Sequence, residues 1–583
     1  MKSLRHANRH ANPLLRLDLQ RWRMRLVMSL IFGGFAALAG RAAYLQIWQN
    51  EFLNLQGDKR INRVVPIPAH RGMILDRRGE PLAISTPVES VWVNPREAEA
   101  SPEQIAALAA LLQEDADALA RIFAARDKTF VYLKRQIPPD LAKRCLELNI
   151  KGVYAQPEFR RFYPAGDVIA QVVGMTNIED RGIEGLEVLY NTWLAGEPGL
   201  KRVIRDRKGN VVEELELLRL PKPGNHLTLS LNLQIQYLAY RELATAVERH
   251  QARAGSVVVL DSRTGEILAM ATVPSFNPNN RATYSADRAR NRPATDAFEP
   301  GSTIKPFLMA AALDAGLITP ETRIDTGPGY YYVGDKRITD VHPKGVLSVT
   351  ESLQVSSNVA AARIAMDLRS EDYWQLLSQA GFGRAPGAGL PGEVSGRLRA
   401  WRTWRPIEKA TMGFGHGMSV SLLQLARAYT AFANDGVMPP LTVLKLREQP
   451  VGQRVMSAKT ARMVRAMLEA VTQDGGTAPQ ARVMGYRVAG KTGTAHKLVG
   501  GSYAPNKYIA SFVGLAPVSD PRLVVAVMID EPSGRQYYGG LVAAPVFSKV
   551  MAGALRLMAV PPDAPMDAVT APNSKAPVIG EDV

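Results

Sequence analysis

Cysteine is almost absent from this chain of 583 residues, which contains only Cys145. A single cysteine excludes an intrachain disulfide and any metal cluster built from several thiolates. Among the eight histidines only His6 and His10, in the basic N-terminal segment, have the H-x-x-x-H spacing at which a helix presents two imidazoles to zinc, and no H-E-x-x-H pattern is present. We therefore expect no metal and no bound cofactor.

Acidic residues are too few to balance the basic ones. The sequence has 55 aspartates and glutamates against 71 lysines and arginines, which gives a net charge of +16. Such an excess fits either nucleic acid or an anionic membrane surface as a partner. However, part of the positive charge is concentrated before residue 26, and the sequence has no RNP, KH, zinc-finger or helix-turn-helix signature. We expect no nucleic-acid binding.

Long apolar runs are also missing, with one exception near the N-terminus. Residues 26–40, LVMSLIFGGFAALAG, carry no charge. A helix of that length spans about 22 Å, short of the ~30 Å hydrocarbon core of a bilayer, but the apolar character continues to Trp48. We predict a transmembrane anchor over 26–48. The basic tail 1–25 places the N-terminus in the cytoplasm and the bulk of the chain outside.

A cleaved signal peptide is the alternative interpretation of this segment. Ala37-Leu38-Ala39 is an A-x-A pattern of the kind that precedes a cleavage site. The leading segment is long and apolar residues continue past Gly40, so a retained anchor is favoured. Small residues on one helix face would permit close packing against a partner helix, although ordinary lipid-facing positions explain them equally. These residues are Gly33, Ala36, Ala37 and Gly40.

The rest of the chain is too long for one hydrophobic core, so at least two domains are expected. Residues 49–225 read as an α+β module without a nucleophile, metal or phosphate-loop signature. Within it, 70–86 has a strand-turn-strand pattern and 102–148 has helical periodicity. The segment PKPGNHL marks a boundary, and a second domain follows over 226–560. The tail 561–583 is rich in proline, alanine and aspartate, and disorder is predicted there.

The second domain begins and ends with strand patterns. A long amphipathic helix at 231–250 precedes two apolar strands around a Ser-Arg-Thr-Gly turn at 254–274. Three further strands are predicted near the other end, at 486–495, 508–517 and 523–532, with helical patterns between the two groups. The sheet would therefore be assembled from both ends of the domain, with helices over its faces. The fold class is α+β.

Three short motifs lie in this domain. Ser302-Thr-Ile-Lys305 is an S-x-x-K pattern that alone would fit a serine-capped helix start with a surface lysine. Downstream, Ser356-Ser357-Asn358 stands at a helix start and Lys491-Thr492-Gly493 lies on a predicted strand. S-x-x-K, S-x-N and K-T-G in this order are the motif set of penicillin-binding proteins and class A β-lactamases. The sequence has no second S-x-x-K and no second K-T-G.

Further segments extend the resemblance over residues 20–560. RGMILDRRGEPLA, RFYPAG and GIEGLE resemble the non-catalytic module of class B penicillin-binding proteins, and EPGSTIKP, TMGFGHGMSV and YYGGLVAAPVF resemble the division-specific type, FtsI. The E-D-x-x-F-x-x-H motif of an attached glycosyltransferase is absent, which excludes the bifunctional class A enzymes. The resemblance implies a single membrane anchor, a pedestal module and a transpeptidase domain with a central antiparallel sheet flanked by helices.

The resemblance also assigns roles to residues. Ser302 would be the nucleophile, exposed at a helix N-terminus, and Lys305, one turn later, its base. A lysine base at neutral pH needs its pKa of about 10.4 lowered by roughly 3 units. Ser356 would relay a proton to the leaving amine, and Asn358 would hold Lys305 and the substrate backbone. The family resemblance assigns the oxyanion hole to the backbone N–H groups of Ser302 and Thr494.

Substrate recognition is implied in the same way. The terminal carboxylate of a D-Ala-D-Ala stem peptide would be bound along the K-T-G strand, by Lys491, Thr492, Gly493 and Thr494. An aromatic wall of the division type would consist of Tyr508, Tyr537 and Tyr538, which fit buried core positions equally well. The loop GFGHG at 413–417 resembles a dinucleotide loop but lacks the βαβ frame, and we interpret it as a tight turn near the site.

The predicted function is a serine D,D-transpeptidase that cross-links peptidoglycan at the division septum. We expect its catalytic domain in the periplasm, β-lactams as inhibitors, and an FtsW-type glycosyltransferase and other division proteins as partners. An elongation-type transpeptidase and a D,D-carboxypeptidase of the same fold are the nearest alternatives. A soluble β-lactamase is less favoured, because no E-x-x-L-N-like element lies between Asn358 and Lys491. The non-enzyme alternatives are a β-lactam sensor and a division scaffold.

Overall fold

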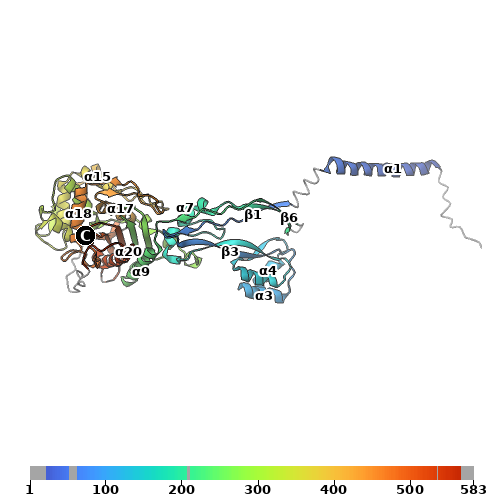
Figure 1. Cartoon of the computed structure of the whole chain (residues 1–583), viewed down its shortest axis with the longest axis horizontal. Helices are drawn as coiled ribbons and strands as arrows, with labels where there is room; N and C mark the ends of the chain where they lie inside the picture. Colours follow the sequence, from blue (N-terminus) through green and yellow to red (C-terminus); the bar gives the residue numbers. More distant parts are fainter. Residues whose placement is uncertain (1–20, 51–61, 206–210, 535, 566–583) are drawn as a thin grey trace, which may run out of the picture.

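Three parts follow one another in Figure 1: a separate helix, an elongated module of strands, and a larger C-terminal unit of sheet and helices. The computed structural model describes residues 21–50, 62–205, 211–534 and 536–565. Most of the predicted basic tail and most of the predicted disordered C-terminal tail therefore lie outside the described residues. This mixed architecture confirms the predicted fold class.

The separate helix has the length of a membrane span. Helix α1 (Arg21–Ala43) continues through a π-helical turn, η2 (Tyr44–Trp48), to give 28 residues, none of them buried. At 1.5 Å per residue this rod measures about 42 Å, more than the ~30 Å of a hydrocarbon core. It is the one helix among the described residues that is long and apolar enough to cross a membrane. It is consistent with a single-pass anchor, and an N-terminal signal sequence would share these properties.

The elongated module is built on two sheets. Three antiparallel strands form the first, in the order β1 (Asn62–Ile67), β6 (Gly199–Arg205) and β7 (Val211–Arg219). In the second sheet β4, β3, β2 and β8 are neighbours in that order, and β5 also pairs with β3. Its strands are β2 (Ile74–Leu75), β3 (Pro81–Val93), β4 (Val131–Ile137), β5 (Val153–Phe162) and β8 (Leu227–Thr228). The predicted strand-turn-strand at 70–86 is the antiparallel β2–β3 pair.

One prediction for this module was wrong. The segment 102–148, predicted to be helical, contains α3 (Pro102–Leu112), α4 (Ala116–Ala124) and α5 (Pro139–Glu147), but strand β4 lies between α4 and α5. The β4 sequence VYLKRQI buries Leu133 and Ile137 and pairs antiparallel with β3. Strong helical periodicity on both sides hid this short strand, whose β-branched and aromatic residues favour a sheet.

Three segments that carry the family resemblance meet at one buried ion cluster. Arg71, from RGMILDRRGEPLA, donates from Nε and Nη2 to Glu187 Oε2 at 2.8 and 2.6 Å. Arg161, from RFYPAG, donates from Nε to Glu187 Oε1 at 2.6 Å. Glu187 ends GIEGLE on α7 (Gly185–Leu189), and all three side chains are buried. Because an unpaired buried charge is costly, each segment holds the other two in place.

The C-terminal unit contains a five-stranded antiparallel sheet in the order β10-β9-β19-β18-β17. Its strands are β9 (Ala254–Asp261), β10 (Ile267–Val273), β17 (Ala489–Val499), β18 (Ser502–Ala516) and β19 (Leu523–Asp530). The early β9 pairs with the late β19, so the sheet is assembled from both ends of the domain, as predicted. Every residue of β9 and β19 is buried, which fits a central strand covered on both faces.

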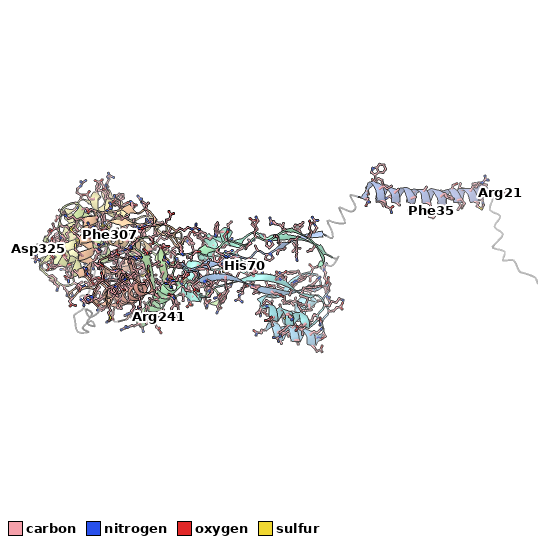
Figure 2. All side chains as sticks on the ribbon, viewed as in Figure 1. Arg21, Phe35, His70, Arg241, Phe307 and Asp325 are labelled. Carbon is pink, nitrogen blue, oxygen red and sulfur yellow. The ribbon has the colours of Figure 1, made fainter. Side chains whose placement is uncertain are left out.

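Helices cover this sheet and form a second layer beyond it. Helices α9 (Leu233–Arg249) and α20 (Ala544–Leu557) pack together against the sheet, and α17 (Leu422–Ala433) also contacts β9 and β19. Phe307, labelled in Figure 2, is buried and packs against Phe382 and against Phe432 of α17. The remaining helices of this unit that are longer than five residues are α12 (Lys305–Asp314), α13 (Val349–Gln354), α14 (Asn358–Asp367), α15 (Ser370–Gln379), α16 (Pro406–Met412) and α18 (Ala458–Ala470).

Short strands and turns complete the unit at its surface. The strands are β11 (Arg323–Asp325), β12 (Tyr330–Val333), β13 (Lys336–Thr339), β14 (Val346–Ser348), β15 (Val437–Met438) and β16 (Gln453–Arg454).

The described structure includes the first residues of the tail that was predicted to be disordered, 561–565. Asp563 accepts hydrogen bonds from the backbone N–H of Arg487 at 2.7 Å and from Ser519 Oγ at 2.9 Å. Structure therefore extends a few residues past position 560.

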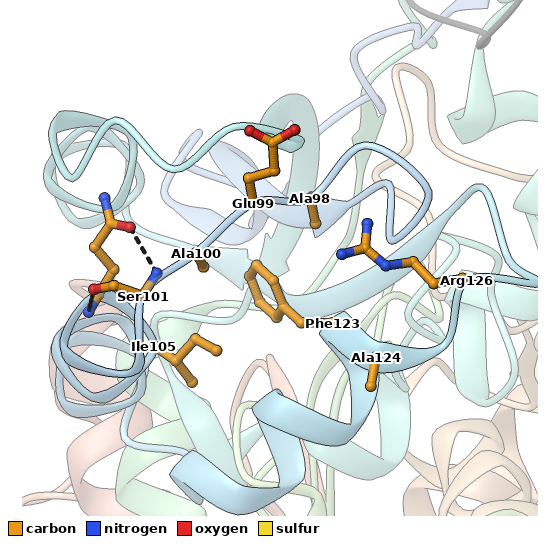
Figure 3. Close-up of a pocket in the computed structure, with 9 residues that line it drawn as sticks. Ala98, Glu99, Ala100, Ser101, Ile105, Phe123, Ala124 and Arg126 are labelled. Carbon is orange, nitrogen blue, oxygen red and sulfur yellow. Dashed lines mark hydrogen bonds between the residues drawn. The ribbon is translucent and has the colours of Figure 1, made fainter.

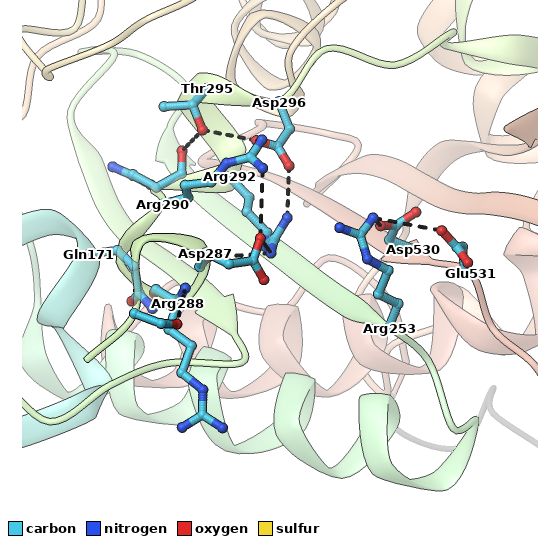
Figure 4. A network of polar contacts seen from close by, with 12 residues as sticks. Gln171, Arg253, Asp287, Arg288, Arg290, Arg292, Thr295, Asp296, Asp530 and Glu531 are labelled. Carbon is cyan, nitrogen blue, oxygen red and sulfur yellow. Dashed lines mark hydrogen bonds and ion pairs between the residues drawn. The ribbon is translucent and has the colours of Figure 1, made fainter. Parts of the chain in front are cut away.

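Figure 4 shows a polar network beside the N-terminal end of β9. Arg253 Nη1 lies 3.2 Å from Asp530 Oδ2 at the end of β19. Arg292, which is 2% exposed, bridges Asp287 at 2.8 Å and Asp296 at 3.0 Å. A buried arginine between two carboxylates fixes the short helix α11 (Arg292–Thr295), and this helix leads into the segment that carries Ser302.

Candidate active site

Ser302 lies on a 3₁₀ turn, η5 (Gly301–Ile304), that runs directly into α12. The prediction of an exposed serine was wrong, because Ser302 is only 1% exposed. The turn is fixed by Thr303, the residue after Ser302. Its Oγ1 donates to Pro300 O at 2.7 Å, and its carbonyl accepts from Tyr429 Oη at 2.7 Å. The turn therefore holds Ser302 in a set position, enclosed by the protein.

Lys305 is the first residue of α12 and is completely buried. Its Nζ donates to Ser356 O at 2.6 Å, to Asn358 Oδ1 at 2.8 Å and to Ser356 Oγ at 3.1 Å. These contacts join S-x-x-K to S-x-N across more than 50 residues of sequence. They fix the amine one helical turn beyond Ser302, with the Ser356 hydroxyl in direct contact with it.

The S-x-N motif is held in turn by a carboxylate that sequence analysis missed. Asp340 accepts from Ser357 Oγ and from the backbone N–H of Asn358, both at 2.6 Å, and from the N–H of Val359 at 2.9 Å. These are the first N–H groups of α14, so the carboxylate caps the helix and favours its positive end. Ser356, just before the helix, has a left-handed φ of 62°.

Asp340→Ala is expected to loosen this arrangement. Loss of a charged cap should lower the free energy of unfolding by about 1–2 kcal/mol. Because Ser356 and Asn358 then hold Lys305 less firmly, the rate of penicillin acylation should fall about tenfold, which is about 1.4 kcal/mol in the barrier. Thermal unfolding and stopped-flow acylation measure the two effects.

Asp335→Ala is the matched control, since Asp335 lies in the same hairpin but its side chain is 87% exposed. An acylation rate equal to the wild-type rate in Asp340→Ala would show that the cap does not position the motif.

The K-T-G motif lies on the edge strand β17, directly against the Ser302 turn. Lys491, Thr492 and Thr494 are buried, and Lys491 Nζ donates to Thr492 Oγ1 at 3.1 Å. A Cβ on Gly493 would lie 2.9 Å from Thr303 Cγ2 and 3.0 Å from Pro300 O. Only glycine permits this approach of strand and turn, so the close contact explains the residue type at the third position of the motif.

The three tyrosines predicted as an aromatic wall come together. Tyr508 and Tyr537 stack with ring centroids 4.2 Å apart, and Tyr537 lies 4.4 Å from Tyr538. All three are half-buried, so they are not core residues. In the β17–β18 register Tyr508 pairs with His496, two residues beyond Thr494. The rings therefore line the continuation of the K-T-G strand, and their contact with substrate stays a prediction.

A second group missed by sequence analysis surrounds Glu299, three residues before Ser302. Glu299 Oε2 accepts from Tyr503 Oη at 2.9 Å and lies 3.4 Å from His416 Nδ1. Burial, with His496 and Lys305 nearby, lowers the pKa of His416 to about 4, so this ring is neutral at pH 7. Tyr503 belongs to the tip of the β17–β18 hairpin, and its bond to Glu299 ties that tip to the segment before the nucleophile.

The GFGHG loop supplies His416 and is the tight turn near the site that was predicted. Gly415 and Gly417 have φ values of 89° and 83°. A Cβ on Gly415 would lie 2.1 Å from Gly301 O, so the loop packs directly on the Ser302 turn. The backbone N–H of Gly417 donates to Glu299 Oε1 at 2.9 Å.

A separate cleft lies in the elongated module, at residues 98–126, well before Ser302 in the sequence. Figure 3 shows it between α3 and α4, lined by Ala98, Phe123 and Arg126 among others. Its serine, Ser101, caps α3 in a reciprocal arrangement with Gln104 and has no lysine or histidine beside it among the residues that line the cleft. Without a lysine or histidine in the lining to activate this serine, the cleft lacks the serine–base arrangement of the Ser302 site.

Comparison with known families matches both large parts of the chain. Residues 255–552 match the model of the penicillin binding protein transpeptidase domain, and residues 66–229 match that of the penicillin-binding protein dimerisation domain. The two matched regions correspond to the C-terminal unit and the elongated module.

Individual relatives extend over nearly the whole chain. The probable peptidoglycan D,D-transpeptidase PenA of Neisseria meningitidis is 44% identical over 550 residues, 94% of each chain. The peptidoglycan D,D-transpeptidase FtsI of Escherichia coli is 40% identical over 549 residues, 93% of each chain. The solved structure of penicillin binding protein 3 from Mycobacterium tuberculosis, complexed with aztreonam, superposes with a TM-score of 0.66 at 28% identity, covering 86% of this chain and 99% of that one. The chain therefore belongs to the class B penicillin-binding proteins and is a peptidoglycan D,D-transpeptidase.

Proposed function

We propose that this transpeptidase cross-links septal peptidoglycan through an acyl-enzyme on Ser302 and that β-lactams inhibit it by acylating the same residue. The observation that carries the proposal is the set of contacts of Lys305 Nζ, which lies 2.6–3.1 Å from Ser356 and Asn358 within one turn of Ser302. A buried amine touching a hydroxyl beside a serine is the arrangement that nucleophilic attack on an amide requires.

The acylation step uses all members of this group. Ser302 Oγ attacks the carbonyl carbon between the two D-alanines, and its proton passes to Lys305, which acts as an unprotonated amine. When the C–N bond breaks, the proton passes through the Ser356 hydroxyl to the departing D-alanine nitrogen. Asn358 holds Lys305 in position through its Oδ1 contact of 2.8 Å. The second amine, from a neighbouring stem peptide, then attacks the ester and returns a proton to Ser302 Oγ.

Charge that develops on the carbonyl oxygen needs preorganised donors. We assign the backbone N–H groups of Ser302 and Thr494 to this oxyanion hole, each worth about 3 kcal/mol of barrier lowering. The close packing of Gly493 against Thr303 brings the two backbone segments together. Lys491, Thr492 and Thr494 bind the terminal carboxylate, and the tyrosine wall borders the same groove.

A β-lactam follows the same first step with one difference. Its amide lies in a ring, so the broken C–N bond leaves the amine attached to the acyl group. No residue of the proposed mechanism activates water for hydrolysis, so the adduct should persist. A D,D-carboxypeptidase of the same fold would resolve the natural acyl-enzyme with water instead of an amine, and this remains the nearest enzymatic alternative.

Placement in the cell completes the proposal. The basic residues before the anchor favour a cytoplasmic N-terminus, which puts the pedestal at 49–225 and the transpeptidase domain at 226–560 in the periplasm. Relatives named FtsI support a role at the division site. Its partner there, in this proposal, is an FtsW-type glycosyltransferase that polymerises the strands. An elongation-type transpeptidase is the alternative, since class B enzymes serve both processes.

The test uses cells depleted of their own division transpeptidase. The full-length chain should remain membrane-bound and restore septation. Gly33→Leu with Ala37→Leu should leave penicillin labelling unchanged and at least double the mean cell length, because bulky residues prevent close packing of α1 on a partner helix. Cell length and labelled protein in membranes are the measurements.

Ile31→Leu with Phe35→Leu, on the opposite helix face, is the matched control and should divide normally. Rod shape without septation in cells carrying the wild-type chain would favour the elongation type. Normal division with both bulky substitutions would leave α1 as a simple tether.

A further inference from the structure

The β12–β13 hairpin presents two tyrosines to solvent beside the active site. Its register pairs Tyr330 with Thr339 and Tyr332 with Arg337, so these four residues share one face. Tyr330 is 42% exposed and Tyr332 is 55% exposed. The other face buries Val333 and Ile338. Two large aromatic side chains on the wet face of a short hairpin are not explained by the core of the domain.

The exposed side chains are ordered by one another. The rings of Tyr330 and Tyr332 meet edge to face with centroids 5.8 Å apart, and the Arg337 guanidinium lies 5.8 Å from the Tyr330 ring centre. Beneath them, the ring of Tyr331 lies 4.9 Å from the guanidinium of Arg363, which belongs to α14. The hairpin is therefore attached to the S-x-N helix, and its outer face keeps a defined shape.

The base of the hairpin is hydrogen-bonded to Asn358 of the S-x-N motif. Thr339 O accepts from Asn358 Nδ2 at 3.4 Å, and the next residue, Asp340, caps α14. Asn358 in turn contacts Lys305. Tyr332 and Arg337 lie two residues further from the base, about 7 Å along a strand. The outer face is therefore within the reach of a short extended peptide, at roughly 3.5 Å per residue, from the reacting bond.

The chemistry of this face selects among partners. It combines flat aromatic surfaces, a guanidinium and hydroxyl groups, and it has no aliphatic side chain. A hairpin of two four-residue strands offers far less surface than the roughly 800 Å² per partner that a stable protein–protein contact buries. A sugar ring, by contrast, has a C–H face that stacks on an aromatic ring, and hydroxyl, amide and carboxylate groups that accept hydrogen bonds from arginine. The substrate stem peptide is itself attached to a glycan strand that has to lie outside the groove.

We infer that the outer face of the β12–β13 hairpin, formed by Tyr330, Tyr332, Arg337 and Thr339, binds the glycan strand that carries the substrate stem peptide. The inference deepens the proposed function and rests on it, because the surface is of use to an enzyme that acts on stem peptides still attached to their strands. The hairpin supplies affinity for the polymer and takes no part in bond making, so short peptide substrates and penicillins do not use it.

The test measures binding of glycan strands from which an amidase has removed the stem peptides. The full-length protein should bind these strands, and Tyr330→Ala with Tyr332→Ala should weaken the Kd at least fivefold. Replacement of both tyrosines by phenylalanine should preserve most of the affinity, because the ring faces remain. Tyr237→Ala on α9 is the matched control, since Tyr237 is also 55% exposed, and it should bind like the wild type.

Penicillin labelling is measured on every variant and should be unchanged. If the double alanine variant loses labelling because its fold is damaged, Arg337→Ala decides the question and should weaken the Kd at least threefold. The inference would be overturned by a Kd within twofold of the wild-type value in the double alanine variant or, if that variant is misfolded, in Arg337→Ala. An equal loss of affinity in Tyr237→Ala, or no binding of peptide-free strands by the wild type, would also overturn it. Failure of the proposed function would instead appear as penicillin labelling away from Ser302.

Discussion

Replacement of Ser302 by alanine is expected to abolish covalent labelling by a fluorescent penicillin. The adduct requires a new bond between Ser302 Oγ and the opened ring, and the residues beside it serve only to move protons and hold the ligand. Labelling should fall to background, at least a thousandfold below the wild type. In-gel fluorescence of membranes carrying each variant measures the effect.

Ser256→Ala is the matched control for this substitution. Ser256 is another buried serine, on β9, and its Oγ has no hydrogen-bond partner in the part of the chain that the structure describes. Its removal should leave labelling unchanged. Labelling that survives in Ser302→Ala would refute the assigned nucleophile.

The two active-site lysines should respond differently to substitution. Lys305→Ala is expected to lower the acylation rate about a thousandfold, in the range of other general bases, whereas Lys491→Ala should mainly weaken recognition of the ligand carboxylate and disturb the oxyanion geometry. Arginine should rescue neither, because a guanidinium stays protonated and has a different shape. Stopped-flow acylation over a range of penicillin concentrations separates the maximal rate from the apparent affinity.

A surface lysine provides the control for these measurements. Lys549, on α20, pairs with Glu242 at 3.0 Å and has a 62% exposed side chain, so Lys549→Ala should acylate normally. A wild-type maximal rate in Lys305→Arg would contradict the proposed base. Equal loss of maximal rate in both alanine variants, with affinity unchanged, would contradict the separate roles of the two lysines.

The parts of the fold that could be predicted from sequence are those with a local pattern. Two apolar hairpin segments far apart in the chain predicted a sheet assembled from both ends, and β9 pairs with β19 as expected. Strand β4 was missed because a short strand between two strongly periodic helices has too few residues to show its own alternation. The separate apolar helix was predicted because its composition alone identifies it.

In the candidate site, too, residues with a local sequence pattern were predicted and residues that act over long sequence distances were not. The three motifs were found because each has a fixed spacing, and the contact of Lys305 with Asn358 agrees with the roles expected of them. Asp340 and Glu299 were missed, since each acts on partners 17 or more residues away and no short pattern marks a long-range contact. The burial of Ser302 also escaped prediction, because it depends on the packing of β17 and the GFGHG loop against the turn. The catalytic roles themselves stay predictions.

Mass spectrometry of the wild-type protein after incubation with benzylpenicillin tests the central claim most directly. One penicillin should be bound per chain, the modified proteolytic peptide should be the one that contains EPGSTIKPF, and fragmentation should place the added mass on Ser302. The adduct should still be present hours after free drug is removed, because no group in the proposed mechanism activates water. Modification of a different residue, or rapid loss of the adduct with release of hydrolysed drug, would contradict the account.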